Sequence, residues 1–176
     1  DFKCARGIGH SLMAYSYFYR LSRRQQKIYL KSETINTVRL KDIDELKLLT
    51  QKLEQQLPTG DVVLVEDCSQ ALVNTLCQQL RFASARINVL ERRPHNDYGE
   101  LHGLYEPVER TRPRAKIYVW MRTAKRQQVV AFKTYLRTLI HEFCHHLDFE
   151  YYKFEDSFHT KGFFQRESSI VKQLYE

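Results

Sequence analysis

The stretch TLIHEFCHHLD (residues 138–148), with His159 downstream, decides which fold and which chemistry this chain can support. Residues four apart on a helix lie on the same face, so His141 and His145 can offer two imidazole nitrogens to one metal ion. Glu142 lies about a quarter-turn from His141, where its carboxylate can reach a water on that metal without binding the ion. A catalytic zinc needs three protein ligands and an open position. We expect His159 to be the third ligand.

The residues around this stretch predict a helix with two distinct faces. Residues 129–140 contain no glycine or proline. Three- and four-residue spacing produces one apolar stripe, made of Phe132, Leu136, Leu139, Phe143 and Leu147. A polar line runs along another face and comprises Thr134, Thr138, His141, His145 and Asp148. The histidines therefore need not be core residues, although a surface helix that carries histidines by chance remains the alternative.

Length and composition indicate one globular domain. The chain has 176 residues, of which 43% are apolar, and it lacks an apolar run near 18 residues, so we expect no membrane partner. Its four cysteines are sparse and form no Cys-x-x-Cys pair, which favours a reducing, cytoplasmic setting over a disulfide scaffold. The chain begins with Asp1 and not with Met, so we expect a fragment, a processed form or a trimmed form of a longer product.

The charge balance is basic, with a formal net charge of +7. The basic side chains cluster at residues 23–24, 92–93, 110–116 and 125–126. Such clusters are compatible with DNA or another anionic partner. A solvated basic surface without a specific partner explains them equally well, because few aromatic residues lie among them.

The remaining pattern predicts an α+β chain. Helices are expected at Ser11–Arg20, Leu40–Leu57 and Ser69–Phe82, with a break at residues 58–60 and a run of strand or helix-entry character at residues 61–66. Strands are expected at Arg86–Glu91, Glu100–Glu106 and Ala115–Met121, and residues 94–99 read as a loop. Because the strands follow one another at short distances, we predict a small three-stranded, mainly antiparallel sheet. The motif helix and a second helix over Phe163–Tyr175 complete the layout.

Several residues compete with His159 for the third ligand position. His146 points about 100° away from its neighbour His145 around the helix, and Glu150 lies off the ligand face. Glu167 stays open as the ligand of a Glu-type site. His159 is favoured because it follows a plausible chain reversal at residues 155–157 and precedes a helix that can fold back beside the first.

The pattern His141-Glu142-Phe-Cys-His145, then His159 and the run Thr160-Lys-Gly162-Phe-Phe164, resembles the SprT-like metallopeptidase domain. The resemblance covers about the last 60 residues. That family includes the Spartan proteases, which act on DNA–protein crosslinks. This chain departs from the family pattern because Thr160 follows the third histidine, and it has no C-terminal four-cysteine zinc ribbon. Residues 101–105 are also similar to the ImmA/IrrE type, which usually takes a Glu as third ligand.

The resemblance implies a zincin-like fold in a single domain over residues 1–176, with a helical part at 1–60 and a catalytic core at 61–176. It implies a Zn2+-dependent endopeptidase, and less directly a substrate among DNA-associated proteins. In that mechanism a metal-activated water attacks the peptide bond and Glu142 acts as general base. The alternative class is a non-catalytic zinc-containing module that binds nucleic acid or protein.

Supporting roles are less sharply indicated. A donor that stabilises the oxyanion is expected among Tyr105, His102 and Arg166, although each of these is more easily read as structural. Asp148 or Thr138 can orient a ligand imidazole through its second nitrogen, and Asp148 is the better candidate because it lies three residues after His145.

Overall fold

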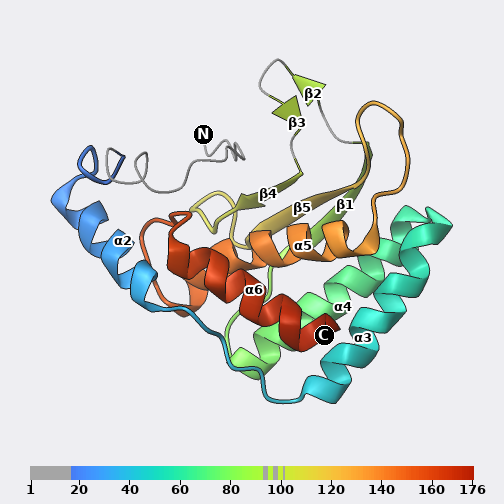
Figure 1. Ribbon diagram of the computed structural model, residues 1–176, viewed down its shortest axis with the longest axis horizontal. Helices are drawn as coiled ribbons and strands as arrows, with labels where there is room; N and C mark the ends of the chain where they lie inside the picture. Colours follow the sequence, from blue (N-terminus) through green and yellow to red (C-terminus); the bar gives the residue numbers. More distant parts are fainter. Residues whose placement is uncertain (1–16, 93–94, 97–98, 101) are drawn as a thin grey trace.

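The computed structural model describes residues 17–92, 95–96, 99–100 and 102–176, and this part of the chain has an α+β architecture (Figure 1). The helical elements are α2 (Arg23–Thr34), α3 (Ile43–Gln56), the 3-10 turn η1 (Leu57–Thr59), α4 (Val62–Leu80), α5 (Phe132–His146), the π-helical turn η2 (Leu147–Tyr151) and α6 (Lys161–Tyr175). The strands are β1 (Arg86–Arg92), β2 (His95–Asn96), β3 (Gly99–Glu100), β4 (Gly103–Glu106) and β5 (Lys116–Arg122). Within these residues, no helix has both the length and the apolar character that a membrane crossing requires.

Local signals set the ends of the N-terminal helices. The Asp42 side chain accepts a hydrogen bond from the Glu45 amide and starts α3, as the predicted helix over residues 40–57 requires. Gly60 adopts a positive φ of 71° and ends η1, which confirms the predicted break. The Asp61 carboxylate caps the next helix, so the run at residues 61–66 is the beginning of α4. In the predicted helix at Ser11–Arg20, residues 11–16 lie outside the described part of the chain.

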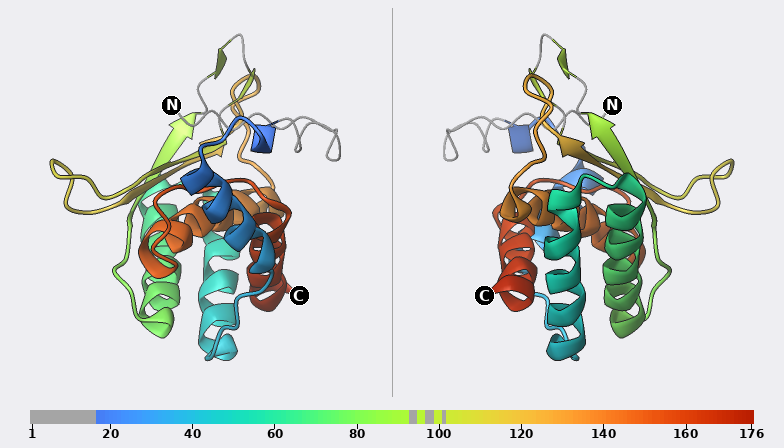
Figure 2. Two further views of the ribbon diagram at one scale, coloured as in Figure 1. Left: turned by 90° about the vertical axis from the view of Figure 1, so that its left-hand side faces the viewer. Right: turned by 90° about the vertical axis from the view of Figure 1, so that its right-hand side faces the viewer.

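One apolar core joins the helices to the sheet. Figure 2 shows α3, α4, α5 and α6 on the same side of the three-stranded sheet. The apolar stripe predicted for the motif helix is buried there, since Leu136, Leu139 and Phe143 are fully enclosed. They meet the leucine stripes of α3 and α4, which include Leu46, Leu53, Leu72 and Leu76. Burial of each such side chain contributes about 1.5–3 kcal/mol, which fixes the orientation of α5.

The sheet is mixed, with strand order β1-β5-β4. β5 pairs antiparallel with β4 but parallel with β1, so the prediction of a mainly antiparallel sheet was wrong for one of its two pairings. The physical reason is the order of the strands: the chain reverses between β1 and β4, and β5 then returns between them in the direction of β1. Within the predicted loop at residues 94–99, the short strands β2 and β3 pair with each other, while residues 94, 97 and 98 lie outside the described part. The predicted strand at Glu100–Glu106 corresponds only in part to β4, which starts at Gly103: Glu100 belongs to β3, and residue 101 lies outside the described part.

Two features of this fold place the candidate site. β4 forms an edge of the three-stranded sheet, and α5 lies against both β4 and β5. After α5 the π-helical turn η2 ends the helix, and the Tyr152 amide donates to the Leu147 carbonyl. The chain then turns back through residues 152–160, and Thr160 caps α6 by accepting a hydrogen bond from the Phe163 amide. His159 immediately precedes this cap, which returns it to the side of α5.

Candidate metal centre

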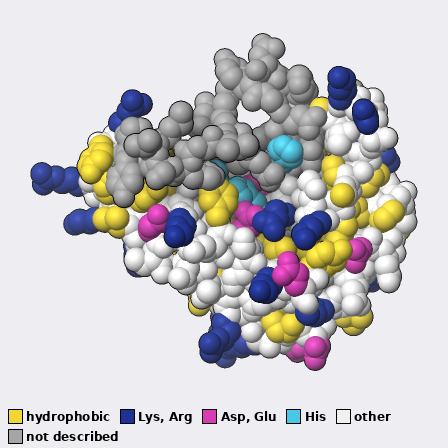
Figure 3. All heavy atoms as spheres, viewed as in Figure 1, with side chains coloured by type: hydrophobic (Ala, Val, Ile, Leu, Met, Phe, Trp, Pro, Cys, Tyr) yellow, Lys and Arg dark blue, Asp and Glu magenta, His cyan; other side chains and the backbone are white. Residues whose placement is uncertain are grey.

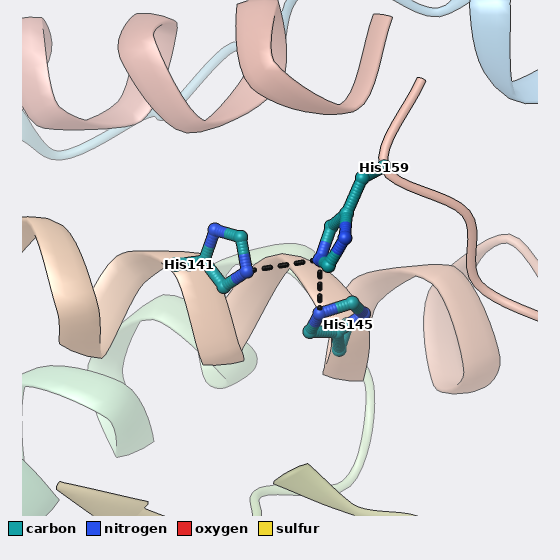
Figure 4. Close-up of side chains that lie close together, drawn as sticks. All are labelled: His141, His145 and His159. Atoms are coloured by element: carbon teal, nitrogen blue, oxygen red, sulfur yellow. Dashed lines mark hydrogen bonds between the residues drawn. The ribbon is translucent and has the colours of Figure 1, made fainter. Parts of the chain in front are cut away.

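Three imidazole rings converge between α5 and the segment before α6 (Figure 4). The Nε2 atom of His159 lies 3.0 Å from Nε2 of His141 and 3.0 Å from Nε2 of His145. One nitrogen from each ring lies within 4.8 Å of the others. Among the described residues, no other group of three or more His, Cys, Asp and Glu side chains is arranged in this way. The structure therefore brings together the three residues that the sequence nominated as ligands.

The second nitrogen of His141 has a carboxylate partner. Its Nδ1 lies 2.9 Å from Oε2 of Glu167 on α6. A carboxylate accepts, so the ring donates from Nδ1 and keeps the lone pair of Nε2 for the centre. The other oxygen of Glu167 lies 3.5 Å from Nη1 of Arg137. Glu167, the rival third ligand in the sequence, thus lies behind a ligand and not among the converging nitrogens.

The second nitrogen of His145 has a hydroxyl partner. Its Nδ1 lies 2.7 Å from Oγ of Ser157, and that hydroxyl donates to Oδ2 of Asp148 at 2.7 Å. Asp148 was the predicted orienting residue, and it reaches His145 through Ser157. Thr138, the other candidate for this role, donates to the Thr134 carbonyl of its own helix. Ser157 carried no signal in the sequence, because its role depends on the return of the chain after η2.

This arrangement fits a divalent cation. The lone pairs of the three Nε2 atoms point at one place and repel each other unless a positive charge lies between them. A proton on Nε2 of His159 could form a hydrogen bond to only one of the two neighbouring rings. Burial, followed by the charges of the neighbouring rings, lowers the pKa of His145, while burial and then His141 lower the pKa of His159 to about 4. Part of the His159 residue is exposed to solvent, but its imidazole ring packs against the rings of Phe163 and Phe164. The rings of His145 and His159 are thus neutral near pH 7, the form that binds metal.

The spacing and the donor set suit zinc. Two nitrogens about 2.0–2.1 Å from one tetrahedral ion lie roughly 3.3 Å apart, close to the observed 3.0 Å separations. Imidazole is a preferred donor for zinc and for several other transition metals. The exposure of His159 leaves the centre reachable from solvent. The space-filling view shows histidine side chains at this surface, with Lys, Arg and Asp or Glu side chains beside them (Figure 3).

Glu142 occupies a separate, buried position beside the triad. The residue is 5% exposed, and no described residue donates a hydrogen bond to its carboxylate. It faces Gly103 on β4, where an added Cβ would lie 2.6 Å from Oε1 and 2.8 Å from Cγ of Glu142. Burial raises the pKa of Glu142 to about 7, with His141 lowering it and Glu167 raising it to smaller extents. No pattern in the sequence predicted that a glycine in β4 makes this space.

His146 has a structural role, as its direction on the helix predicted. Its Nε2 donates to the Ala83 carbonyl at 2.7 Å, so its Nδ1 accepts from the Tyr105 hydroxyl at 3.1 Å. Both nitrogens are thus used away from the triad. Cys144 is completely buried in the core and does not join the site.

The three candidate oxyanion donors differ in position. Arg166 is fully buried and bonded to Asp148 and to backbone carbonyls of α2, so it does not reach the centre. The Tyr105 hydroxyl is bonded to His146, while its ring stacks on His145 with centroids 6.3 Å apart. His102 is half-buried and directly precedes β4. Arg166 and Tyr105 therefore have structural roles here.

No family model, curated protein or solved structure matches this chain. The fold and the site together define an α+β protein with a candidate three-histidine metal centre and a buried glutamate beside it.

Proposed function

We propose that this protein is a zinc-dependent endopeptidase with a zincin-like fold. The observation that carries the proposal is the position of Glu142, a buried carboxylate next to the triad that is not one of its converging ligand atoms. A purely structural zinc site is closed by four protein ligands and has no use for a neighbouring carboxylate with a raised pKa. Only three suitable donors converge among the described residues.

In this proposal each residue has a defined task. His141, His145 and His159 would hold the ion, and Glu167 and Ser157 would orient two of the rings. When bound, zinc would supply Lewis acidity that lowers the pKa of water and polarises a carbonyl. Glu142 takes the proton from the attacking water and delivers it to the leaving amine. Burial raises the pKa of this carboxyl in the metal-free protein, which favours a group that can both accept and return a proton.

The sheet offers a place for the substrate backbone. β4 is an edge strand beside α5, and an extended peptide can pair with such an edge as an added strand. The basic composition and the resemblance to SprT-like domains support proteins associated with DNA as the substrate class. Cys68, Cys77 and Cys144 are free thiols, which supports a cytoplasmic setting.

The test compares wild type with Glu142→Gln and His159→Ala. Metal content is measured by elemental analysis, and cleavage is measured on casein and on a DNA-bound protein, with and without DNA. We expect Glu142→Gln to retain zinc but lose cleavage, and His159→Ala to lose both. Cleavage by Glu142→Gln at the wild-type rate would overturn the proposal. Zinc in wild type without any cleavage would favour the binding-module alternative.

A further inference from the structure

A buried chain of hydrogen bonds connects the C-terminal end of α2 to His145. Arg166 donates from Nη1 to the carbonyls of Ser32 at 2.8 Å and Ile35 at 2.6 Å. Its Nη2 donates to Oδ1 of Asp148 at 2.8 Å. Oδ2 of Asp148 accepts from Ser157, whose Oγ lies 2.7 Å from Nδ1 of His145. This chain of hydrogen bonds thus links α2, α6 and η2, through Ser157 in the segment before α6, to one imidazole.

The direction of each hydrogen bond follows from the chemistry of its groups. A guanidinium only donates and a carboxylate only accepts, so Asp148 receives hydrogen bonds from both sides. The Ser157 hydroxyl has a single proton, and it gives that proton to Asp148. Its oxygen must then accept from Nδ1–H of His145. This leaves the Nε2 lone pair of His145 toward His141 and His159.

This chain of hydrogen bonds is buried, so each of its groups depends on its protein partners. Asp148 and Arg166 are 0% exposed and Ser157 is 4% exposed, so bulk water does not reach the chain to replace a lost partner. The carbonyls that hold Arg166 belong to Ser32, in the last turn of α2, and to its C-cap residue Ile35, at a helix end where carbonyls have few amide donors. The charge of Arg166 is balanced by Asp148, which keeps the carboxylate oriented toward Ser157.

We propose that Ser157 is a positioning residue, whose hydroxyl, anchored by Asp148 and Arg166, holds His145 in the tautomer that can bind metal. The inference rests on the proposed metal centre and goes beyond it, because it assigns a function to a serine that touches neither the ion nor the substrate. The opposite tautomer carries its proton on Nε2, which lies 3.0 Å from Nε2 of His159. That proton would link the two rings and occupy the place of the ion.

The first experiment observes the tautomer without metal and without substrate. Nitrogen chemical shifts of the histidine rings are measured by NMR at pH 7.5 in metal-free wild type, Ser157→Ala and Ser157→Thr. We expect the Nδ1–H tautomer of His145 in wild type and in Ser157→Thr, which retains a hydroxyl. Ser157→Ala should show a mixture or the Nε2–H form. An unchanged tautomer in Ser157→Ala would overturn the proposal.

The second experiment measures zinc affinity by competition with a chromophoric chelator. Loss of a partner that orients a ligand typically costs about 10–100-fold in metal affinity, and we expect that loss in Ser157→Ala. The matched control is Ser69→Ala, which removes another buried hydroxyl, bonded to Val65 and Tyr135 in the core. The control should bind zinc like wild type. Equal weakening in both variants would show a general effect of stability and would overturn the proposal.

The two proposals fail in different ways. Absence of proteolysis would contradict the proposed function but leave the tautomer and affinity results as measured. An unchanged tautomer in Ser157→Ala would contradict the positioning role of Ser157 even in an active peptidase. If its extra methyl group finds no space, Ser157→Thr will not fold. In that case the zinc affinities of Ser157→Ala and Ser69→Ala still test the positioning role of Ser157.

Discussion

The carboxyl group of Glu142 lies in a niche that disfavours its charged form. Burial raises its pKa from the ordinary value of 4.5 to about 7. A group whose pKa is raised by folding contributes stability that is fully present below the unfolded pKa and is lost as the pH rises through the folded pKa. That window runs from about pH 4.5 to about pH 7. Above it, the ionised carboxylate costs the metal-free protein on the order of 3 kcal/mol.

Glu142→Gln should therefore stabilise the metal-free protein at alkaline pH. The amide has nearly the same shape and stays neutral, so it avoids the cost of the buried charge. We expect a gain on the order of 3 kcal/mol at pH 8 that disappears near pH 4.5, where wild type is itself protonated. Urea denaturation of both metal-free proteins at the two pH values measures the difference. Equal stability at pH 8 would show that the carboxylate is solvated.

Some residues of the candidate site could be predicted from their spacing in the sequence, whereas others come together only in the folded chain. His141, Glu142 and His145 could be nominated because helical geometry alone relates them. His159 required an assumption about the return of the chain, which the structure now places beside α5. The positions of Ser157 and Glu167 depend on η2 and α6, and no spacing rule connects them to the motif. For Glu167, the sequence left contact with the metal open as an alternative to His159, whereas the structure places its carboxylate on Nδ1 of His141.

At the scale of the element, β4 does more than supply a sheet edge. Gly103 in this strand lies directly against the Glu142 side chain, and the absence of a Cβ makes the space for the carboxylate. Successive side chains of a strand point to opposite faces. Gly103 therefore faces the glutamate, while its neighbour Leu104 points away.

Gly103→Ala should displace Glu142 without disturbing the histidines. The new Cβ would lie 2.6–3.0 Å from three atoms of the side chain, so the carboxylate must move. Because a displacement near 1 Å can cost about 100-fold in rate, we expect kcat/KM for casein to fall by about that factor with zinc content unchanged. Leu104→Ala, on the same strand, is the control and should keep most of the activity. A rate for Gly103→Ala within a few-fold of wild type would contradict the proposed role of Glu142.

The helices could be predicted more fully than the sheet. Apolar periodicity is local, and it placed α3 and the motif helix close to their observed bounds. The predicted helix at Ser69–Phe82 was too short at its start, because α4 begins at Val62 after the Asp61 cap. Strand pairing is not local. The insertion of β5 between β1 and β4 depends on which faces α4 and α5 cover, so the parallel pairing of β1 with β5 was missed.

At the scale of the whole molecule, α2 is part of the support of the candidate metal centre. It runs beside the segment that carries His159: Arg24 pairs with Glu155, Gln25 donates to Asp156 at 3.0 Å, and the ring of Tyr29 lies near that of Phe158. The sequence assigned α2 only to a helical N-terminal part, because contacts between residues more than 120 positions apart leave no local pattern.

Gly162→Ala tests whether this support matters for metal binding. Gly162 packs against the end of α2, where an added Cβ would collide with the Ser32 carbonyl oxygen and lie 2.7 Å from that of Glu33. Both obstacles are backbone atoms, so α2 must move outward and loosen its hold on residues 155–160. We expect faster amide exchange throughout α2 and a zinc affinity lowered by about tenfold or more, as for other losses of outer support.

The control for this variant is a second glycine with a different environment. Gly60→Ala forces an alanine into a backbone with φ of 71° and should cost about 1 kcal/mol of stability. The nearest atoms to the added Cβ belong to Arg122 and Val129 and not to α2. Its zinc affinity should stay at the wild-type level. If Gly162→Ala frees α2 in the exchange experiment yet binds zinc as tightly as wild type, then α5 and α6 hold the three histidines on their own. If its affinity falls while that of Gly60→Ala does not, the N-terminal helix and the histidine centre form one functional unit.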